Sequence, residues 1–154
     1  MLNFEKISMT YKDNIIPNKV LENIDFKIKA NDISIIIGNS GVGKSTFLNI
    51  IGCLLKPDSG TVTIDSMRMN LNSKKIENFR VKNFSYIFQN KNLLPEFNIY
   101  DNLLIPAYIN KLDINETKKQ INKLLSYMEI ENLKYSYPDH ISNGEGQRIA
   151  ILRS

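Results

Sequence analysis

The sequence predicts an α/β fold in which a buried strand, a glycine-rich loop and a helix follow one another directly. Residues 33–37 form a short β-branched run of the kind that occurs in fully buried parallel strands. The following residues match the pattern G-x-x-x-x-G-K-[ST] through Gly38, Gly43, Lys44 and Ser45. Residues 47–51 are then apolar at helical spacing. This order predicts a phosphate-binding loop between a strand and a helix.

The residue types of this loop suit a nucleoside triphosphate. Glycines let the backbone bend so that N–H groups converge on phosphate oxygens, and a helix beginning near Lys44 adds its positive dipole end. Lys44 is expected to bridge the β- and γ-phosphates, and the Ser45 hydroxyl to bind Mg²⁺. The alternative is a Gly/Ser-rich turn with a solvated lysine. The predicted nucleotide-binding residues of the loop are Gly38, Asn39, Ser40, Gly41, Val42, Gly43, Lys44, Ser45 and Thr46.

Composition narrows the class of protein. The chain has 154 residues and a formal net charge of +4, but its lysines are scattered, so no nucleic-acid partner is predicted. The N-terminus has no signal pattern, and no apolar run approaches the length that spans a bilayer. We therefore expect an intracellular protein without direct membrane insertion. The single Cys53 is expected to be a small core residue.

Periodicity and turn signals predict the elements of the first half. Residues 2–7 and 20–28 alternate apolar and polar, as half-exposed strands do. Between them the chain is expected to turn at residues 9–14 and to form a polar loop around Pro17. The helix that starts at Lys44 is expected to end near Leu55, before a strong turn signal. A further strand is predicted at residues 61–65, followed by a short helix and loops.

The second half is predicted to be mainly helical. An aromatic-rich strand at residues 84–88 comes first. Residues 101–128 then favour helix, with an interruption at Pro106 and a clear amphipathic pattern after Asn115. A last helix is predicted to begin at Ser142.

Three further features accompany the phosphate loop. Tyr11, in a turn after the first strand, presents an aromatic face that can stack on adenine. Gln89 ends a predicted strand, where open α/β sheets place ligand-contacting groups. Residues 142–148 open a helix with a hydroxyl and small residues, which favours a second anion-binding site. One chain has one γ-phosphate to bind, so this second site indicates presentation to another subunit.

Together, in this order, these segments resemble the ATP-binding subunits of ABC transporters. Residues 86–97 (YIFQNKNLLPEF), with Asp101-Asn102-Leu103 and Pro106, look most like the branch of lipoprotein-releasing, macrolide-exporting and bacteriocin-exporting ATPases. The resemblance implies a P-loop NTPase fold with an N-terminal antiparallel β segment and a helical subdomain. It implies one ABC-type domain over residues 1–154: a core with the Walker A loop at 1–89, a helical subdomain at 90–141 and a signature helix at 142–154.

The resemblance also implies roles for single residues. Tyr11 would stack on adenine, and Lys44 and Gln89 would take part in catalysis, with Ser45 and Gln89 reaching Mg²⁺. A second ATP-binding subunit would form a head-to-tail dimer, and a membrane permease would hold the pair at the inner face of the cell membrane. The residues that would contact the nucleotide of the opposite subunit are Ser142, Asn143, Gly144 and Glu145.

The chain departs from the family pattern in three respects. Asn143 replaces the first signature glycine, and Gly146 stands in the first turn of a helix, where glycine costs about 0.5–1 kcal/mol against alanine. The Walker B Asp and Glu are absent. The switch histidine is also absent, because the one histidine of the chain, His140, precedes the signature as an exposed loop residue. We therefore expect a C-terminally incomplete domain that lacks core strands, binds ATP and is inactive alone.

Rival functions remain open at this point. One is a non-catalytic truncated remnant, and another is a soluble ABC-type ATPase such as a translation factor. A P-loop kinase is less favoured, because it would explain neither Gln89 nor residues 142–148.

Overall fold

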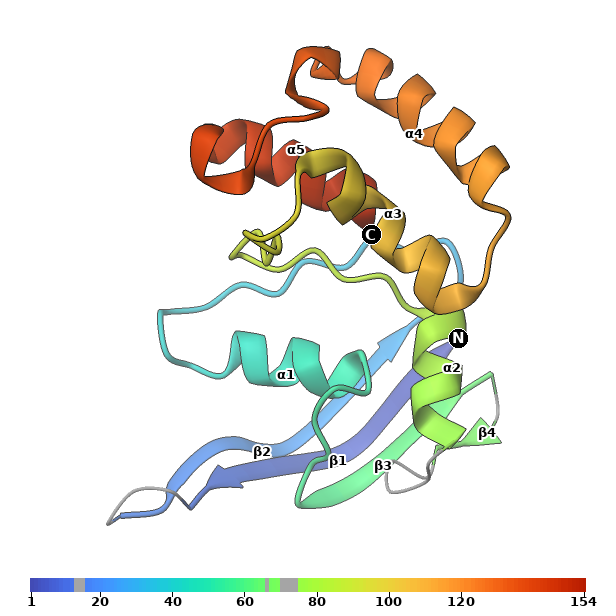
Figure 1. The fold of residues 1–154 in the computed structure, drawn as a ribbon. Helices are drawn as coiled ribbons and strands as arrows, with labels where there is room; N and C mark the ends of the chain where they lie inside the picture. Colours follow the sequence, from blue (N-terminus) through green and yellow to red (C-terminus); the bar gives the residue numbers. More distant parts are fainter. Residues whose placement is uncertain (13–15, 66, 70–74) are drawn as a thin grey trace. The chain divides into compact units, whose positions relative to one another are not determined.

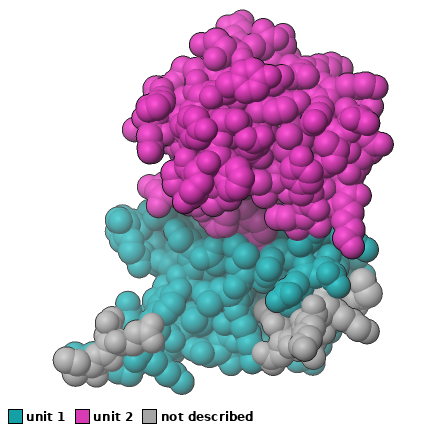
Figure 2. Space-filling model, viewed as in Figure 1, with its two compact units in different colours: residues 1–84 teal, residues 85–154 magenta. Residues whose placement is uncertain are grey.

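The computed structural model describes residues 1–12, 16–65, 67–69 and 75–154. The chain divides into two compact units, residues 1–84 and 85–154, which Figure 2 colours separately. Each unit has its own hydrophobic core. Within the described residues, no helix combines the length and apolar character that crossing a membrane requires. The predicted division into core, helical subdomain and signature helix stays a prediction.

The first unit is built on an antiparallel sheet with strand order β2-β1-β3-β4 (Figure 1). The strands are β1 (Leu2–Tyr11), β2 (Asn18–Ile28), β3 (Ser59–Ile64) and β4 (Met67–Arg68). The predicted antiparallel β segment is therefore confirmed. The predicted turn at residues 9–14 begins too early, because β1 continues to Tyr11, which pairs with Asn18 of β2. Cross-strand hydrogen bonds extend the strand beyond its alternating segment.

Helix α1 (Lys44–Ile51) covers one face of this sheet (Figure 1). The ring of Phe47 packs edge-on against Phe4 of β1 and Phe26 of β2, at centroid distances of 5.9 and 5.4 Å. The helix is shorter than predicted, since Gly52 caps it and Cys53 adopts a positive φ of 59°. Cys53 is buried as expected, and burial raises the pKa of its thiol.

Helix α2 (Lys75–Asn83) agrees with the predicted short helix between residues 66 and 83. The loop residues 66 and 70–74 of that stretch lie outside the described residues. The side chain of Ile76 and that of Phe79 pack against the core of the first unit. Arg80 donates from its guanidinium to the carbonyl oxygen of Cys53 at 3.2 Å. This bond ties α2 to the end of α1.

The predicted strands at residues 33–37 and 84–88 are not present. Residues 33–37 pair with no strand among the described residues, and Ile33, Ile35 and Ile37 are 95%, 80% and 88% exposed. Residues 84–88 are likewise outside any strand, although the rings of Tyr86 and Phe88 stack at 5.7 Å. A parallel strand is stable only when neighbouring strands supply its hydrogen bonds. Neither segment belongs to the described sheet, whose strands are β1 to β4.

The second unit is a small helical assembly. Its helices are α3 (Ile99–Asn110), α4 (Ile114–Tyr127) and α5 (Asn143–Arg153), with short 3-10 helices at Glu131–Leu133 and Pro138–His140. Apolar residues of all three α-helices share one core, including Leu103, Leu125 and Ile149. Helix α3 runs through Pro106, so the predicted interruption is wrong. Burial of Leu103, Leu104 and Ala107 around the proline offsets its cost of about 3 kcal/mol.

Candidate nucleotide-binding site

The glycine-rich loop of the first unit leads directly into α1. Gly43 is the N-cap residue of this helix, with a φ of 102° in the left-handed region. A Cβ atom at this position would lie 2.7 Å from Val20 Cγ1 and 3.0 Å from the Val20 carbonyl oxygen. Glycine is therefore required both by the backbone conformation and by the close approach of β2. The sheet thus holds the loop at the point where the helix begins.

The N-terminus of α1 is open. No side chain caps it, and no acidic residue lies in its first turn. The first backbone bond runs from the Phe47 N–H to the Gly43 carbonyl, at 2.8 Å. The N–H groups of Lys44, Ser45 and Thr46 thus have no acceptor among the described residues. Free donors at the positive end of a helix favour an anion, and phosphate oxygens can accept from all three.

Lys44 lies folded over the loop that precedes it. Its Nζ donates to the carbonyl oxygens of Gly38 and Asn39, at 2.8 and 2.7 Å. The Ser45 side chain is exposed beside it. A flexible ammonium, a free hydroxyl and three unpaired N–H groups form a donor set that fits a phosphate chain. All nine loop residues predicted for this site, 38–46, lie in the first unit.

Tyr11 meets the same helix from the sheet. It ends β1, and its half-buried side chain packs against the core of the first unit. The Tyr11 hydroxyl lies 3.2 Å from Thr46 Oγ1. Thr46 is only 8% exposed. The structure therefore brings Tyr11 to the phosphate loop through its hydroxyl, and stacking of its ring on adenine stays a prediction.

Gln89 lies in the second unit, on an exposed segment before α3. It lines an open pocket of about 540 Å³ with the neighbouring residues 90–93 and with Asn143 and Gln147 of α5. Several amide side chains in this pocket can each donate and accept hydrogen bonds. The structure thus places Gln89 beside the first two turns of α5. Its predicted contact with Mg²⁺ stays a prediction.

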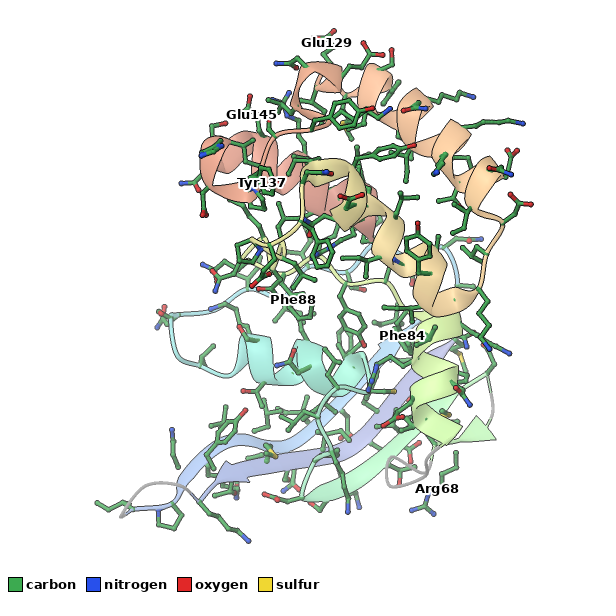
Figure 3. The ribbon with its side chains drawn as sticks, in the orientation of Figure 1. Arg68, Phe84, Phe88, Glu129, Tyr137 and Glu145 are labelled. Carbon is green, nitrogen blue, oxygen red and sulfur yellow. The ribbon has the colours of Figure 1, made fainter. Side chains whose placement is uncertain are left out.

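The N-terminus of α5 is closed by its own side chains. Ser142 is the N-cap, and its Oγ accepts from the Glu145 N–H at 3.3 Å. In return the Glu145 carboxylate accepts from the Ser142 N–H at 2.7 Å, which completes a capping box. These bonds from Ser142 hold the pKa of Glu145 below its usual range. Figure 3 shows Glu145 on the first turn of this helix. Asn143 and Gly144 are exposed beside it.

Gly146 lies against a neighbour that the sequence did not reveal. It is buried, and a Cβ atom there would lie 2.2 Å from Cδ of Lys91. The Lys91 side chain therefore crosses α5 where an alanine methyl group would stand. Two turns later Arg153 donates to the carbonyl oxygens of Asn92 and Lys91, at 2.7 and 3.1 Å. Lys91 of the segment after Gln89 thus lies beside the first turns of α5, and Arg153 bonds the same segment to the end of the helix.

Asn102 is a residue whose role the sequence analysis missed. It is fully buried in α3, and its side-chain oxygen accepts from the Leu94 N–H at 2.8 Å. Its amide nitrogen donates to the carbonyl oxygens of Leu94, Phe97 and Asn98. The loop between Gln89 and α3 is therefore shaped by one side chain. A polar residue between Ile99 and Leu103 on the apolar side of a helix was the available signal.

His140 is exposed, as expected, at the end of the 3-10 helix before Ser142.

Comparison with known proteins gives a family and several relatives. The family model described as "ABC transporter" matches residues 21–154. The lipoprotein-releasing system ATP-binding protein LolD of Cytophaga hutchinsonii is 40% identical over 136 residues, which are 88% of this chain and 62% of the relative. The methionine import ATP-binding protein MetN of Francisella tularensis is 36% identical over 155 residues, covering 100% of this chain and 44% of the relative. The chain thus spans about three fifths of the length of the LolD relative.

Solved structures of ATP-binding cassettes are also similar to this chain. A dimeric post-hydrolysis state of the ATP-binding cassette MJ0796, bound to ADP and Pi, superimposes with a TM-score of 0.89 at 32% identity. The match covers 99% of this chain and 68% of that chain. The protein cbiO1 of Clostridium perfringens, part of the cbiONQ transporter complex, gives a TM-score of 0.80 at 28% identity. That match covers 99% of this chain and 59% of that chain. The predicted P-loop fold of ABC ATPase type is confirmed.

Proposed function

Because the chain belongs to the ABC transporter family of ATP-binding domains, we propose that it binds ATP for export by a separate membrane permease. The open N-terminus of α1, with Lys44 folded over the glycine-rich loop, is the observation that carries this proposal. Export is favoured over import by the likeness of residues 86–97 to exporter ATPases and by the LolD relative. The similarity to MetN, which is named for methionine import, would instead favour import. The permease would hold the subunit at the inner face of the membrane.

The loop residues would act on the phosphates directly. The Lys44 ammonium exchanges its two carbonyl acceptors, Gly38 and Asn39, for phosphate oxygens. The free N–H groups of residues 44–46 donate to the same phosphate chain. The Ser45 hydroxyl and Gln89 are the groups proposed to hold Mg²⁺, which supplies charge neutralisation on the phosphates when bound. The N–H groups of residues 44–46 need break no internal bond to donate to phosphate, whereas Lys44 has to give up its two carbonyl acceptors.

A second subunit would complete the arrangement. We propose a head-to-tail dimer in which Ser142, Asn143, Gly144 and Glu145 contact the nucleotide bound by the opposite copy. The dimeric state of the MJ0796 relative supports this proposal. The Ser142 Oγ accepts from the Glu145 N–H and keeps its O–H to donate to a phosphate oxygen, whereas the Ser142 N–H already donates to the Glu145 carboxylate. Each segment therefore has one donor with internal acceptors, the Ser142 N–H in the signature segment and the Lys44 ammonium in the α1 loop.

Binding without turnover stays a prediction for these 154 residues, as do the alternatives of a non-catalytic remnant and a soluble ABC-type ATPase. An assay of phosphate release in the presence of Mg²⁺ and ATP tests the prediction of binding without turnover. Mg²⁺-dependent hydrolysis that Lys44→Ala abolishes would contradict it. Co-sedimentation with ribosomes, against co-purification with a membrane fraction, separates the soluble ATPase from a transporter subunit.

The Lys44→Ala variant tests nucleotide binding itself. Each hydrogen bond to a charged group contributes about 1.5–3 kcal/mol, so losing the ammonium should weaken ATP binding by about ten- to a hundredfold. Isothermal titration of the full chain with ATP, with and without Mg²⁺, measures the effect. The matched control is Lys118→Ala on the exposed face of α4, which should bind as the wild type does. Equal affinity of Lys44→Ala and wild type would overturn the proposed function.

A further inference from the structure

We propose that the Tyr11 hydroxyl positions the phosphate-binding end of α1 by its hydrogen bond to Thr46. The inference rests on the proposed function and deepens it, because it gives Tyr11 a part in phosphate binding that does not depend on the base. Tyr11 is then a positioning residue, which acts on the phosphates through Thr46. The observation behind it is the 3.2 Å separation between the two hydroxyl oxygens.

The position of Tyr11 is well defined. It is the last residue of β1 and pairs with Asn18 of β2, so its backbone is held in the hairpin. The side chain is half-buried against the core that also contains Phe47 and Ile50 of α1. A ring held in this way brings its hydroxyl to one place. The hydroxyl lies at the first turn of α1, where the phosphate donors are.

Thr46 is the partner whose side chain needs such a bond. A threonine in a helix divides between two rotamers, because its hydroxyl can also bond a backbone carbonyl three or four residues earlier. For Thr46 those carbonyls belong to Val42 and Gly43, within the phosphate loop itself. The bond to Tyr11 directs the hydroxyl to the sheet instead. Among the described residues no bond joins the Thr46 hydroxyl to either loop carbonyl, and the Thr46 N–H, a separate donor, has no acceptor there.

The hairpin holds the first turn of α1 at two points. Val20 of β2 lies directly against Gly43, and Tyr11 of β1 bonds Thr46 three residues later. These two contacts fix the direction in which the free N–H groups of residues 44–46 point. A preorganised donor set binds its anion more tightly, because less conformational freedom is lost on binding. Removing one contact should therefore weaken the binding of any polyphosphate, with or without a base.

Stacking and positioning make different demands on Tyr11, so one substitution separates them. Tyr11→Phe keeps the aromatic ring and deletes the oxygen. If the ring acts only by stacking on adenine, this variant binds ATP as the wild type does. If the hydroxyl positions Thr46, the variant loses affinity for ATP and for inorganic tripolyphosphate by a similar factor. The net worth of one hydrogen bond corresponds to about a two- to tenfold loss.

The experiment is a calorimetric titration of the full chain with Mg²⁺–ATP and with Mg²⁺–tripolyphosphate. The temperature is kept below the thermal unfolding midpoint of every variant. The variants are Tyr11→Phe, Thr46→Val, Thr46→Ser, the double variant Tyr11→Phe/Thr46→Val and, as control, Tyr127→Phe. Tyr127 is 80% exposed at the end of α4. We expect Tyr11→Phe and Thr46→Val to weaken both ligands, and Thr46→Ser, which keeps the hydroxyl, to bind like the wild type. The double variant should lose no more than Thr46→Val alone.

Two results would overturn the inference alone: wild-type affinity of Tyr11→Phe for tripolyphosphate, or additive losses in the double variant. A wild-type chain that binds neither ligand would instead overturn the proposed function, and the inference with it.

Discussion

Two helices of this chain, α1 and α5, begin at segments that were both predicted to meet phosphate, yet their first turns are built differently. Helix α1 begins at Gly43, without a side-chain cap and without an acidic residue in its first turn. Helix α5 begins at Ser142, whose hydroxyl and main chain exchange bonds with Glu145. The donors of α1 are free, and part of those of α5 are already used.

The difference separates two uses of a helix N-terminus. Four N–H groups lack intrahelical partners at the start of any helix, and they are satisfied by a cap, by water or by a ligand. In α5 the carboxylate of Glu145 takes the place that an external anion would take. In α1 no group of the described residues does so, and the Lys44 ammonium is bonded to the loop carbonyls of Gly38 and Asn39. An N-terminus without a cap is therefore the better candidate for tight phosphate binding.

The largest expected effect contrasts two glycines, Gly43 at the start of α1 and Gly144 at the start of α5. Gly43→Ala must place a Cβ against Val20 at a positive φ, so strain and overpacking should lower the free energy of unfolding by about 2–5 kcal/mol. Gly144→Ala meets no atom within 4 Å and should stabilise α5 by about 0.5–1 kcal/mol. Urea unfolding measures both. Equal changes in the free energy of unfolding of the two variants would contradict the proposed difference between the N-termini of α1 and α5.

An intermediate effect is expected from removing the cap of α5. Ser142→Ala deletes the oxygen that accepts from the Glu145 N–H, and an N-cap of this kind contributes about 1 kcal/mol. The matched variant in α1 is Ser45→Ala, whose exposed side chain caps nothing and should change stability by less than about 0.5 kcal/mol. Thermal unfolding followed by circular dichroism tests the pair. A Ser142→Ala variant as stable as Ser45→Ala would show that the capping box does not stabilise the helix.

The smallest effect is a pH dependence that belongs to α5 alone. Hydrogen bonds from Ser142 depress the pKa of Glu145 in the folded state. A depressed carboxyl pKa gives stability that is present above the unfolded pKa and is lost as pH falls through the folded value. Glu145→Gln cannot ionise, so its stability should fall less steeply on acidification than that of the wild type. Urea midpoints measured from about pH 6 to pH 3 compare the slopes. Parallel slopes would contradict the depressed pKa.

Local signals predicted much of this structure, and contacts between distant residues explain the failures. The spacing of Gly38, Gly43 and Lys44 identified the phosphate loop, and Ser142 marked the start of α5. Pro106 failed as a helix breaker because buried neighbours on α3 outweigh its local cost. Gly146 is unfavourable for helix formation by its local propensity, but the side chain of Lys91, which is distant in sequence, lies against it. The spacing of apolar residues along the chain does not reveal such contacts between distant residues.

The sequence by itself determined the phosphate loop and the places where α1 and α5 begin, because the signals for them lie within a few residues of one another along the chain. The tertiary structure decided what depends on distant partners. Residues 33–37 have the composition of a buried strand, yet they pair with no described strand and their isoleucines lie exposed. The direction of the Tyr11 hydroxyl was likewise decided by the packing of β1 against α1. A side chain shows its own chemistry in the sequence, but the fold determines which atom it meets.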